Sequence, residues 1–361
     1  MNHINVALIG CGRIGFLLEN DPLRNKPCTH YGGCLSAGIS ITHAVDINEA
    51  RLHHFASLAG LSSSTIFRSH TDLFRQAAPE MVIVATWTES HHEIGIAAAK
   101  NGARLIVMEK PIAPSLIKTR ELLRACKDSG TILLVNHERR YDNRYKKVKS
   151  LIESGAIGEI RTVHASVLTG EYRGNSRIDE GGGPLLHDGT HLVDIIRFFF
   201  GEITCVSGEI TRYTRKSGFE DRAAAWLKTD TGIDIFLEAG GKRNYFTFEL
   251  VIWGSEGKIV IGNGYEKLYK NEKSGFYKGF RDLRERAFPR YKKTSCFSNL
   301  YEETKRLIKN TELPVTSSSL DGYKALEIIH AIYLSAHKNG QKINLPVSPS
   351  SIRLNKIFDL G

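Results

Sequence analysis

Gly10, Gly12 and Gly15 form a Gly-x-Gly-x-x-Gly turn directly after a short apolar run, Ile4 to Ile9. At this spacing the first glycine allows a tight turn, the second presents no side chain, and the third lets a following helix pack close to the strand. The free N–H groups at the start of such a helix favour anionic phosphates. The pattern predicts a dinucleotide site made by Gly10, Cys11, Gly12, Arg13, Ile14 and Gly15. The alternative is a glycine-rich turn without a ligand.

Asp46 ends the second strand pattern, Ile39 to Val45. A carboxylate at this place accepts hydrogen bonds from the ribose hydroxyls of NAD and repels the 2′-phosphate of NADP, so NAD is favoured over NADP. Asp46 lies 31 residues after Gly15, where about 20 is usual. The extra length falls in the turn-rich stretch 20–27, which we interpret as an insertion near the first helix. Arg13 and Arg51 remain candidates to hold a phosphate.

Lys110 follows another apolar run, Leu105 to Met108, and is itself followed by Pro111. Ligands bind beyond the carboxyl ends of strands in open α/β sheets. An ammonium there can hydrogen-bond a reacting oxygen and stabilise a developing alkoxide. Pro111 is expected to begin the next helix. The alternative is a surface lysine beside a proline.

His187 and His191 are four residues apart in a helical pattern, so both rings are expected on one side of the helix. Imidazoles transfer protons reversibly near neutral pH. With Asp194 one turn further on, the same spacing also fits a metal site. We expect no metal, because the surrounding motif described below already explains both histidines.

Apolar strands alternate with helices over the first 135 residues, which predicts a doubly wound parallel sheet. Gly60, Gly102 and Gly130 each follow a predicted helix, at the position of a left-handed cap. From Ile160 onward the strands alternate apolar and polar residues, which is typical of antiparallel strands with one wet face. We predict a Rossmann domain over 1–136 and an α+β domain on a large, mostly antiparallel open sheet over 137–361. A late helix, 321–338, is a candidate to pack back on the Rossmann domain.

The composition limits the class of protein. The 361 residues are 41% hydrophobic and 24% charged, which is ordinary for a globular chain. No apolar run reaches the length of a membrane span. The first residues enter a strand pattern at once, so we expect no signal peptide. The six cysteines form no C-x-x-C pair, which favours free thiols in the cytoplasm.

The formal net charge of +10 fits three explanations: solubility, an anionic ligand such as a phosphorylated or nucleotide-linked sugar, or nucleic acid. No nucleic-acid motif accompanies the charge, so we expect no such partner. Ten of the basic residues lie between Gly264 and Thr294, interleaved with aromatic residues. This segment is expected to be a solvated loop, or else a surface for a phosphate-bearing substrate, a polyanion or a second subunit.

Three further segments resemble a known family. They are Ile83-Val84-Ala85-Thr86-Trp87-Thr88-Glu89-Ser90-His91, Met108-Glu109-Lys110-Pro111, and the run from Gly181-Gly182-Gly183 through His187 and His191 to Asp194. Together with the glycine turn they resemble the Gfo/Idh/MocA oxidoreductases, the glucose–fructose oxidoreductase and inositol dehydrogenase family. The resemblance covers about residues 4 to 340.

The resemblance implies an activity and a set of site residues. Members mostly oxidise or reduce a secondary alcohol of a sugar, inositol or nucleotide sugar with NAD(P), and are commonly homodimers or homotetramers. By position, Lys110 and His191 are implied as catalytic. His187 stands where the family usually has an aspartate, which leaves open which residue is the base. The implied cofactor contacts also include Thr86, Trp87, His91, Glu109, Lys110 and Asn136, and the implied substrate contacts are Lys110, Arg140, Tyr141, His187 and His191.

Two alternative functions stay open. In the first, a tightly held NAD is cycled in a net non-redox reaction, as in an epimerase, lyase or glycosidase. In the second, the chain is a non-catalytic NAD-binding regulator. The presence of both Lys110 and His191 favours an enzyme, since a regulator has no need of acid–base groups.

Overall fold

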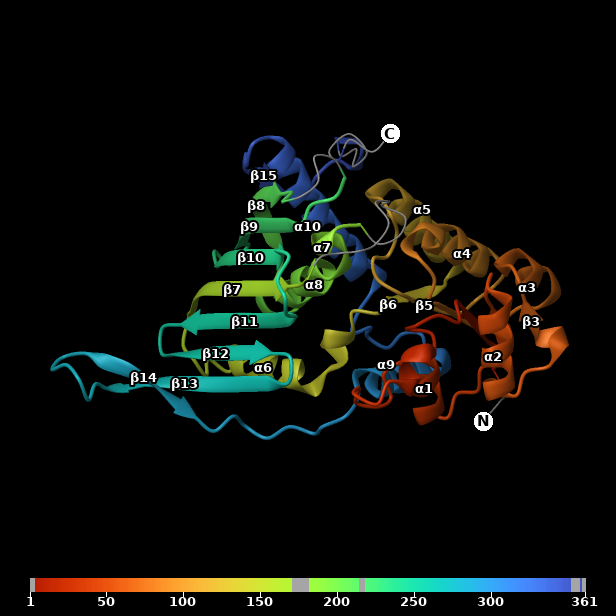
Figure 1. Cartoon of the computed structure of the whole chain (residues 1–361), viewed down its shortest axis with the longest axis horizontal. Helices are drawn as coiled ribbons and strands as arrows, with labels where there is room; N and C mark the ends of the chain where they lie inside the picture. Colours follow the sequence, from red (N-terminus) through yellow and green to blue (C-terminus); the bar gives the residue numbers. More distant parts are fainter. Residues whose placement is uncertain (1–3, 171–181, 214–217, 352–357, 359–361) are drawn as a thin grey trace. The chain divides into compact units, whose positions relative to one another are not determined.

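The computed structural model describes residues 4–170, 182–213, 218–351 and 358. The chain forms two compact units: unit 1 contains residues 1–142 and 294–323, and unit 2 contains residues 143–293 and 324–361. The chain therefore leaves unit 1 and returns to it before ending in unit 2 (Figure 1). The sequence predicts a Rossmann domain over 1–136 and an α+β domain over 137–361. These domain limits stay a prediction, because the two compact units are defined by contacts within the chain and not by function.

Unit 1 is built on a parallel sheet of six strands in the order β3-β2-β1-β4-β5-β6, which confirms the predicted doubly wound fold. β1, β4 and β5 are fully buried, as expected for strands that helices cover on both faces. The strands are β1 (Val6–Ile9), β2 (His43–Val45), β3 (Ile66–Phe67), β4 (Met81–Val84), β5 (Leu105–Met108) and β6 (Ile132–Val135).

Side-chain caps set the limits of the unit 1 helices. The side chains of Asn48 and Ser115 accept hydrogen bonds from the N–H groups of Arg51 and Lys118 at the starts of α2 and α5. Gly60 and Gly130 end the same helices with left-handed backbone, as predicted. The helices are α2 (Glu49–Ala59), α3 (His70–Gln76), α4 (Thr88–Lys100) and α5 (Leu116–Ser129). Because α5 begins at Leu116, the expectation that Pro111 starts this helix is wrong.

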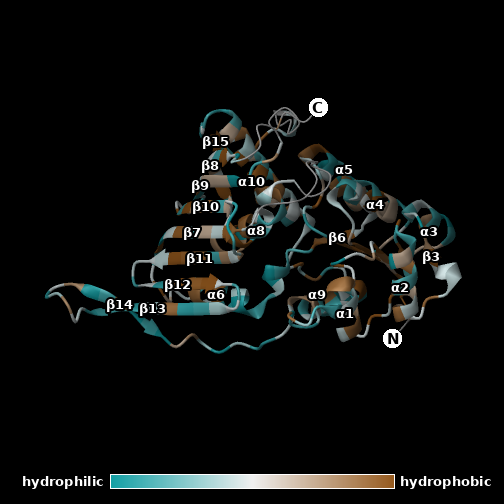
Figure 2. Ribbon diagram, viewed as in Figure 1, coloured by the Kyte–Doolittle hydropathy of each residue, from teal (hydrophilic) through white to brown (hydrophobic). Residues whose placement is uncertain are grey.

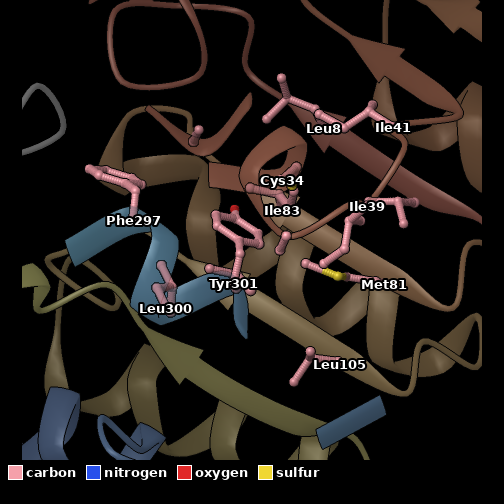
Figure 3. Packing of buried hydrophobic residues seen from close by; sticks show 14 of the residues in the cluster. Leu8, Cys34, Ile39, Ile41, Met81, Ile83, Leu105, Phe297, Leu300 and Tyr301 are labelled. Carbon is pink, nitrogen blue, oxygen red and sulfur yellow. The ribbon is translucent and has the colours of Figure 1, made fainter. Parts of the chain in front are cut away.

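The returning segment adds α9 (Cys296–Lys309) to the core of unit 1. Its buried Phe297, Leu300 and Tyr301 lie in one hydrophobic cluster with residues of the parallel sheet such as Met81 and Leu105 (Figure 3). At Gly33 of α1 (His30–Ser36) an added Cβ would stand 2.5 Å from the Tyr301 ring. The glycine therefore allows α1 and α9 to pack at close range. No helix was predicted over these residues from the sequence.

The first helix is interrupted. After the glycine turn the chain makes a short 3-10 helix, Leu17–Asn20, and α1 begins only at His30. The carbonyls of Ile14 and Gly15 accept hydrogen bonds from the N–H groups of His30 and Tyr31. In an uninterrupted α-helix residues 18 and 19 would donate these bonds. Twelve residues are thus looped out, and we call this segment, residues 18–29, the excursion.

The excursion explains the long interval between Gly15 and Asp46 found in the sequence. It closes on itself through Lys26, whose amine donates to the carbonyls of Leu18, Glu19 and Asp21. The carboxylate of Glu19 accepts from the Cys28 N–H and the Thr29 hydroxyl. The expected insertion is present, but the expected helix directly after the turn is wrong, because the insertion splits it.

Unit 2 is built on a nine-stranded sheet in the order β14-β13-β12-β11-β7-β10-β9-β8-β15. Among the described strands β7 and β10 pair in parallel and the remaining pairs are antiparallel, which confirms the predicted mostly antiparallel sheet. Burial alternates along β7, β9 and β11, whereas β13 and β14 consist mainly of hydrophilic residues (Figure 2). The strands are β7 (Ile160–Leu168), β8 (Ile203–Thr211), β9 (Arg222–Thr229), β10 (Asp234–Gly240), β11 (Thr247–Gly254), β12 (Gly257–Gly262), β13 (Tyr265–Lys273), β14 (Arg281–Arg286) and β15 (Ile343–Asn344).

The unit 2 helices are α6 (Asn143–Glu153), α7 (Pro184–His187), α8 (Gly189–Phe200) and, from residue 324, the rest of α10 (Ser319–His337). The single helix expected over 185–200 is divided at Asp188. Gly181, the first glycine of the family-like run, lies outside the described residues. None of the helices in the described part of the chain is long and apolar enough to cross a membrane.

The basic aromatic segment 264–294 is not a plain loop. β13 and β14 pair antiparallel from Leu268–Arg286 to Lys273–Arg281 and form a hairpin at one edge of the sheet (Figure 1). The hairpin turn exposes Phe276, Tyr277 and Phe280. The expected solvated loop is therefore wrong for residues 265–273 and 281–286, which form strands.

Candidate active site

The glycine turn has the geometry of a phosphate cradle. Gly10 has φ +99°, and an added Cβ would stand 2.5 Å from the carbonyl oxygen of Ala85. At Gly15 a Cβ would stand 2.3 Å from the carbonyl oxygen of Gly10. At Gly12, by contrast, a Cβ would meet no atom within 4 Å. Gly10 and Gly15 thus hold the turn, and Gly12 leaves open space at its tip, which fits close approach of a dinucleotide pyrophosphate.

The turn lies where the strand order of the sheet reverses. The Gly10 N–H donates to the Val45 carbonyl at the end of β2, and the Ala85 N–H at the end of β4 donates to the Ile9 carbonyl. β1 therefore ends between its two neighbours, which lead toward opposite edges of the sheet. In open α/β sheets this switch point is where ligands bind.

Asp46 is tied to the turn. Its carboxylate accepts from the Cys11 N–H at 2.8 Å and from the Asn48 N–H at 2.7 Å. Arg51 donates to both of its oxygens, at 2.9 and 3.3 Å. The carboxylate is buried, whereas the guanidinium of Arg51 is half-exposed. Asp46 thereby fixes the turn and carries a negative charge at the end of β2, which suits NAD.

Arg13 and Cys11 differ in exposure although both belong to the turn. The Arg13 side chain is exposed. Cys11 is buried, and burial followed by the charge of Asp46 raises the pKa of its thiol. Cys11 therefore contributes its backbone N–H to the site and keeps a neutral side chain.

Glu109 lies beyond β5 and its carboxylate is buried. Oε1 accepts from His30 Nε2 at 2.9 Å and from Asn136 Nδ2 at 2.6 Å, and Oε2 lies 3.3 Å from the Lys110 N–H, which donates to it. Burial by itself would raise the pKa of Glu109. The hydrogen bond and the charge of His30, the charge of Lys110 and the hydrogen bond from Asn136 outweigh it and lower that pKa to about 2. Glu109 is therefore an ionised carboxylate directed into unit 1, beside a half-buried Lys110.

His91 supports the same segment from α4. Its Nδ1 is hydrogen-bonded with the Pro111 carbonyl at 2.8 Å, and its Nε2 lies 3.1 Å from the Thr86 carbonyl. Burial lowers the pKa of His91, so the ring is neutral near pH 7. These contacts give His91 a structural role, and direct cofactor contact stays a prediction. Trp87, the residue before α4, is 64% exposed, which leaves its ring accessible.

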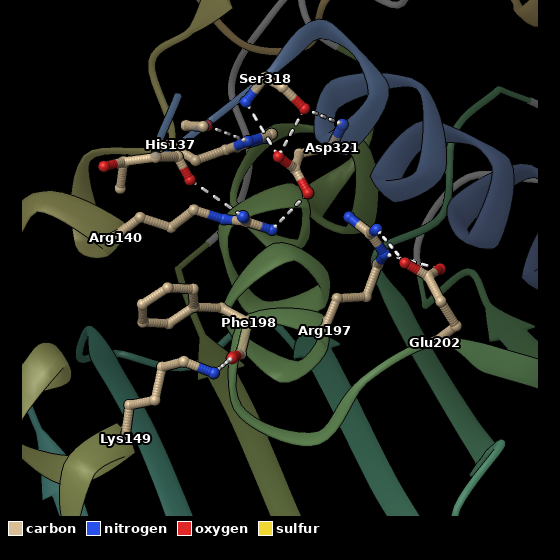
Figure 4. A network of polar contacts seen from close by, with 10 residues as sticks. His137, Arg140, Lys149, Arg197, Phe198, Glu202, Ser318 and Asp321 are labelled. Atoms are coloured by element: carbon tan, nitrogen blue, oxygen red, sulfur yellow. Dashed lines mark hydrogen bonds and ion pairs between the residues drawn. The ribbon is translucent and has the colours of Figure 1, made fainter. Parts of the chain in front are cut away.

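Arg140 and Tyr141 are buried and engaged within unit 1. Arg140 pairs with Asp321 at 3.0 Å and donates to the Thr316 carbonyl, and the N–H of Ser318 donates to the same aspartate (Figure 4). The Tyr141 hydroxyl donates to Glu303. These contacts hold the returning segment 294–323 in unit 1. A role for either side chain in substrate binding stays a prediction.

His187 and His191 lie in unit 2, at the end of α7 and in the first turn of α8. His187 Nδ1 contacts Asp188 Oδ1 at 3.1 Å, and both histidine side chains are partly exposed. At Gly189 an added Cβ would stand 3.0 Å from Leu185 and 3.5 Å from Ala239, so this turn packs tightly on β10. Asp194, in contrast, is buried. Within the described residues, no three His, Cys, Asp or Glu side chains cluster in a way that could hold a metal ion.

Glu220 is a buried carboxyl that was not predicted from the sequence. Its Oε1 accepts from the Leu185 N–H at 3.0 Å and from the Tyr333 hydroxyl at 3.1 Å, while its buried Oε2 has no hydrogen-bond partner among the described atoms. Burial raises its pKa to about 7. It anchors the start of the helical segment that carries His187 and His191. No local sequence pattern distinguishes it from an exposed glutamate.

Two family models match this chain. Residues 4–137 match the oxidoreductase family with an NAD-binding Rossmann fold, and residues 145–260 match the GFO/IDH/MocA C-terminal domain. Together the two matches cover well over half of the chain.

Individual relatives agree with that assignment. The chain is 24% identical over 338 residues to a myo-inositol 2-dehydrogenase of Thermotoga maritima, covering 91% of this chain and 95% of the relative. It is also 24% identical over 258 residues to a 1-carboxy-3-chloro-3,4-dihydroxycyclo hexa-1,5-diene dehydrogenase of Comamonas testosteroni. This second match covers 65% of this chain and 64% of that relative. The crystal structure of the WlbA dehydrogenase from Bordetella pertussis in complex with NADH and UDP-GlcNAcA shares the fold, with a TM-score of 0.77 at 22% identity over 96% of this chain and all of that one.

Proposed function

The chain belongs to the Gfo/Idh/MocA oxidoreductase family, and we propose that it is an NAD-dependent dehydrogenase for a secondary alcohol of a sugar, polyol or nucleotide sugar. The observation that carries the proposal is at the carboxyl edge of the unit 1 sheet. Gly12 leaves open space at the end of β1, and Lys110 follows β5, two strands away in the same sheet. The names of the relatives, an inositol dehydrogenase and a dehydrogenase complexed with a nucleotide sugar, support the substrate class.

The residues of the turn and of β2 would hold the cofactor. The backbone at Gly12 accepts close approach of phosphates, and Asp46 presents a carboxylate for ribose hydroxyls. NAD, when bound, supplies the nicotinamide carbon that accepts a hydride. The Lys110 ammonium would donate a hydrogen bond to the reacting oxygen and stabilise negative charge on it. An imidazole would accept the proton that the substrate hydroxyl loses, because imidazoles exchange protons near neutral pH. We assign this role to His191, with His187 as the alternative.

A substrate screen tests the function. Sugars, inositols and nucleotide sugars are offered with NAD or NADP, and reduction is followed by absorbance. We expect at least one of these alcohols to reduce NAD, and NAD to be preferred to NADP. Turnover with no net reduction would favour the non-redox alternative. No turnover with any compound, together with no binding of NAD, would refute the proposal.

Matched variants test the residue roles. Lys110→Met and His191→Ala are expected to lose at least a hundredfold in turnover with NAD affinity nearly unchanged. The controls are Lys118→Met on α5 and His337→Ala on α10, which remove an exposed lysine and an exposed histidine elsewhere. Full activity of either site variant would refute the role assigned to that residue.

The functional organisation is also proposed. Unit 1 would bind the cofactor and unit 2 the substrate, with the chain forming a homodimer or homotetramer. The six cysteines are all free thiols, which supports a reducing compartment such as the cytoplasm. Sedimentation or light scattering measures the oligomeric state directly.

A further inference from the structure

β14 is the last strand of the unit 2 sheet and has a neighbouring strand on one side only. Its six residues, Arg281–Arg286, carry charges of both signs on either side of a single leucine. All of them except Asp282 are exposed, and Leu283 is 40% exposed. Among the described residues no strand pairs with the outer side of β14 (Figure 1). The strand is therefore an open edge at which a further strand could pair.

Backbone hydrogen bonds indicate which residues of β14 face that edge. The N–H of Ser274 donates to the Phe280 carbonyl at 3.0 Å, so Phe280 directs its carbonyl toward the β13 side of the hairpin. Asn271 stands opposite Leu283, and its N–H donates away from β14, to the Glu256 carbonyl just before β12. Hydrogen-bonded and non-hydrogen-bonded pairs alternate along an antiparallel ladder. Every second residue of β14 therefore directs its N–H and C=O groups to the open edge, and these residues are Arg281, Leu283 and Glu285.

The sequence of β14 is complementary to a second copy of itself. Two antiparallel copies that pair around Leu283 place Arg281 opposite Glu285. The same register places Asp282 opposite Arg284, so each charge meets a charge of opposite sign. A shift of the symmetry axis by one residue would instead place Asp282 opposite Asp282, or Arg284 opposite Arg284. Opposite charges across two strands are stabilising and like charges are destabilising, so the charges favour the register centred on Leu283.

From this geometry we propose that β14 is an interface to a second copy of this chain. Two β14 strands pair antiparallel about a twofold axis at Leu283, and the two nine-stranded sheets join edge to edge. The homo-oligomer of the proposed function would have one of its interfaces here, and only the expectation of an oligomer rests on that function. All residues of the interface lie in unit 2, apart from the residues of the glycine turn in unit 1.

The charged side chains of β14 make only long or exposed ion pairs within the chain at the positions that would face the second copy. Asp282 Oδ2 lies 3.9 Å from Arg284 Nη2, and Glu285 Oε2 lies 3.7 Å from Lys267 Nζ. The guanidinium of Arg281 forms hydrogen bonds with β13, and it makes no ion pair within the described part of the chain. Exposed ion pairs contribute little to stability. These side chains can therefore meet an opposing strand without the loss of a strong contact.

The interface is small, with six residues on each strand. A standard interface buries about 800 Å² on each partner, so β14 alone predicts a weak dimer whose formation depends on concentration. The same register places Phe280, which is 68% exposed, opposite Arg286. A guanidinium beside an aromatic ring adds a favourable contact at each end of the interface.

A pair of complementary variants tests the interface. In Arg284→Asp the changed position stands opposite Asp282, and in Asp282→Arg it stands opposite Arg284, so each variant opposes like charges and should fail to associate through β14. An equimolar mixture of the two variants has opposite charges at both positions and should form a heterodimer. Lys118→Asp makes the same change of charge at an exposed site on α5 and should associate like the wild type. Sedimentation velocity over a wide range of protein concentrations is the assay.

Cysteine cross-linking tests the register. The Cα atoms of a hydrogen-bonded antiparallel pair lie about 5.5 Å apart, within the range of a disulfide. Leu283→Cys should therefore form a covalent dimer when it is oxidised with copper phenanthroline. Arg286→Cys is the matched control on the same strand, since its two copies would lie about 20 Å apart and should not cross-link. The wild type should not cross-link either, because five of its six cysteines are buried and Cys296 is half-buried.

Three results would overturn the proposal. The first is a wild type that stays monomeric at all concentrations. The second is a mixture of the two folded variants that associates no more than either variant alone. The third is an oligomer whose mass neither variant changes, which would place the contact between copies on another surface. NAD binding and turnover, measured on the same proteins, decide the proposed function separately: a wild type that oxidises no alcohol fails that function whatever its mass.

Discussion

Replacing Glu220 by glutamine should change how the stability of unit 2 depends on pH. Burial raises the pKa of this carboxyl from its ordinary value of 4.5 to about 7, although the Leu185 N–H and the Tyr333 hydroxyl act to lower it. Between these two pH values the unfolded chain releases its proton while the folded chain keeps it. Folding therefore loses stability as the pH rises through this range, by about 3 kcal/mol in total.

A second buried group masks this effect in the wild type. Burial lowers the pKa of His330 from 6.5 to about 3. The unfolded chain then binds a proton that the folded chain does not, so stability falls as the pH drops below 6.5. The two dependences have opposite signs and overlap between pH 4.5 and 6.5. Only the difference between the Glu220→Gln variant and the wild type isolates the glutamate.

Urea unfolding at pH 5 and pH 8 is the assay, followed by fluorescence to which Trp226 and Trp253 of unit 2 contribute. We expect the stability of the variant relative to the wild type to rise by about 2.5 kcal/mol from pH 5 to pH 8, because the unfolded chain has already released most of this proton at pH 5. Any constant cost of burying the extra amide hydrogens cancels in this comparison. Glu153→Gln, an exposed glutamate on α6, should show no such gain. A difference between Glu220→Gln and the wild type that is the same at both pH values would refute the reasoning.

Three further predictions concern unit 1. Gly12→Ala should keep the unfolding temperature, because its Cβ would meet no atom, and should lose NAD affinity. Gly15→Ala should be destabilised by about 1–3 kcal/mol, because its Cβ meets the Gly10 carbonyl. Calorimetry measures the stability of each variant, and NADH fluorescence measures its affinity. Asp46→Asn should weaken NAD about tenfold and narrow the preference for NAD over NADP, as titration with both reduced cofactors would show. Deletion of the excursion, residues 18–29, should leave NAD affinity close to that of the full chain, and a loss of binding would show that the excursion itself contacts the cofactor.

Local patterns predicted most of the elements of both units. Fully apolar runs such as Met81 to Val84 indicated buried parallel strands, and alternation in Ile160 to Leu168 indicated an open-faced sheet, because each pattern reports which faces of a strand are covered. Helix starts could be predicted because a cap acts locally: the Ser115 side chain accepts a hydrogen bond from a backbone N–H in the first turn of α5. These local patterns do not show which element from a distant part of the chain packs against a given helix or strand. α9 carries apolar residues at helical spacing, yet nothing local shows that it packs in unit 1.

The residues of the candidate site also differ in how far their contacts lie along the chain. The glycine turn and Lys110 could be predicted as site residues because each stands next to a strand whose end the sequence reveals. Arg140 is predicted from its position to contact substrate, and the sequence could not show that it also pairs with Asp321, far along the chain. His30 was missed for the opposite reason, because its contacts with Glu109 and Tyr301 cross 79 and 271 residues.

The excursion makes the first helix a place where foreign sequence can be spliced. Its two ends are held as neighbours by one turn of hydrogen bonds, so a guest segment with closely spaced ends would be tethered without stretching the host. Leu23 is 93% exposed and offers a graft point that projects into solvent. A reporter fused there would lie 11 residues along the chain from Gly12 and outside the hydrogen bonds that join the two ends of the segment.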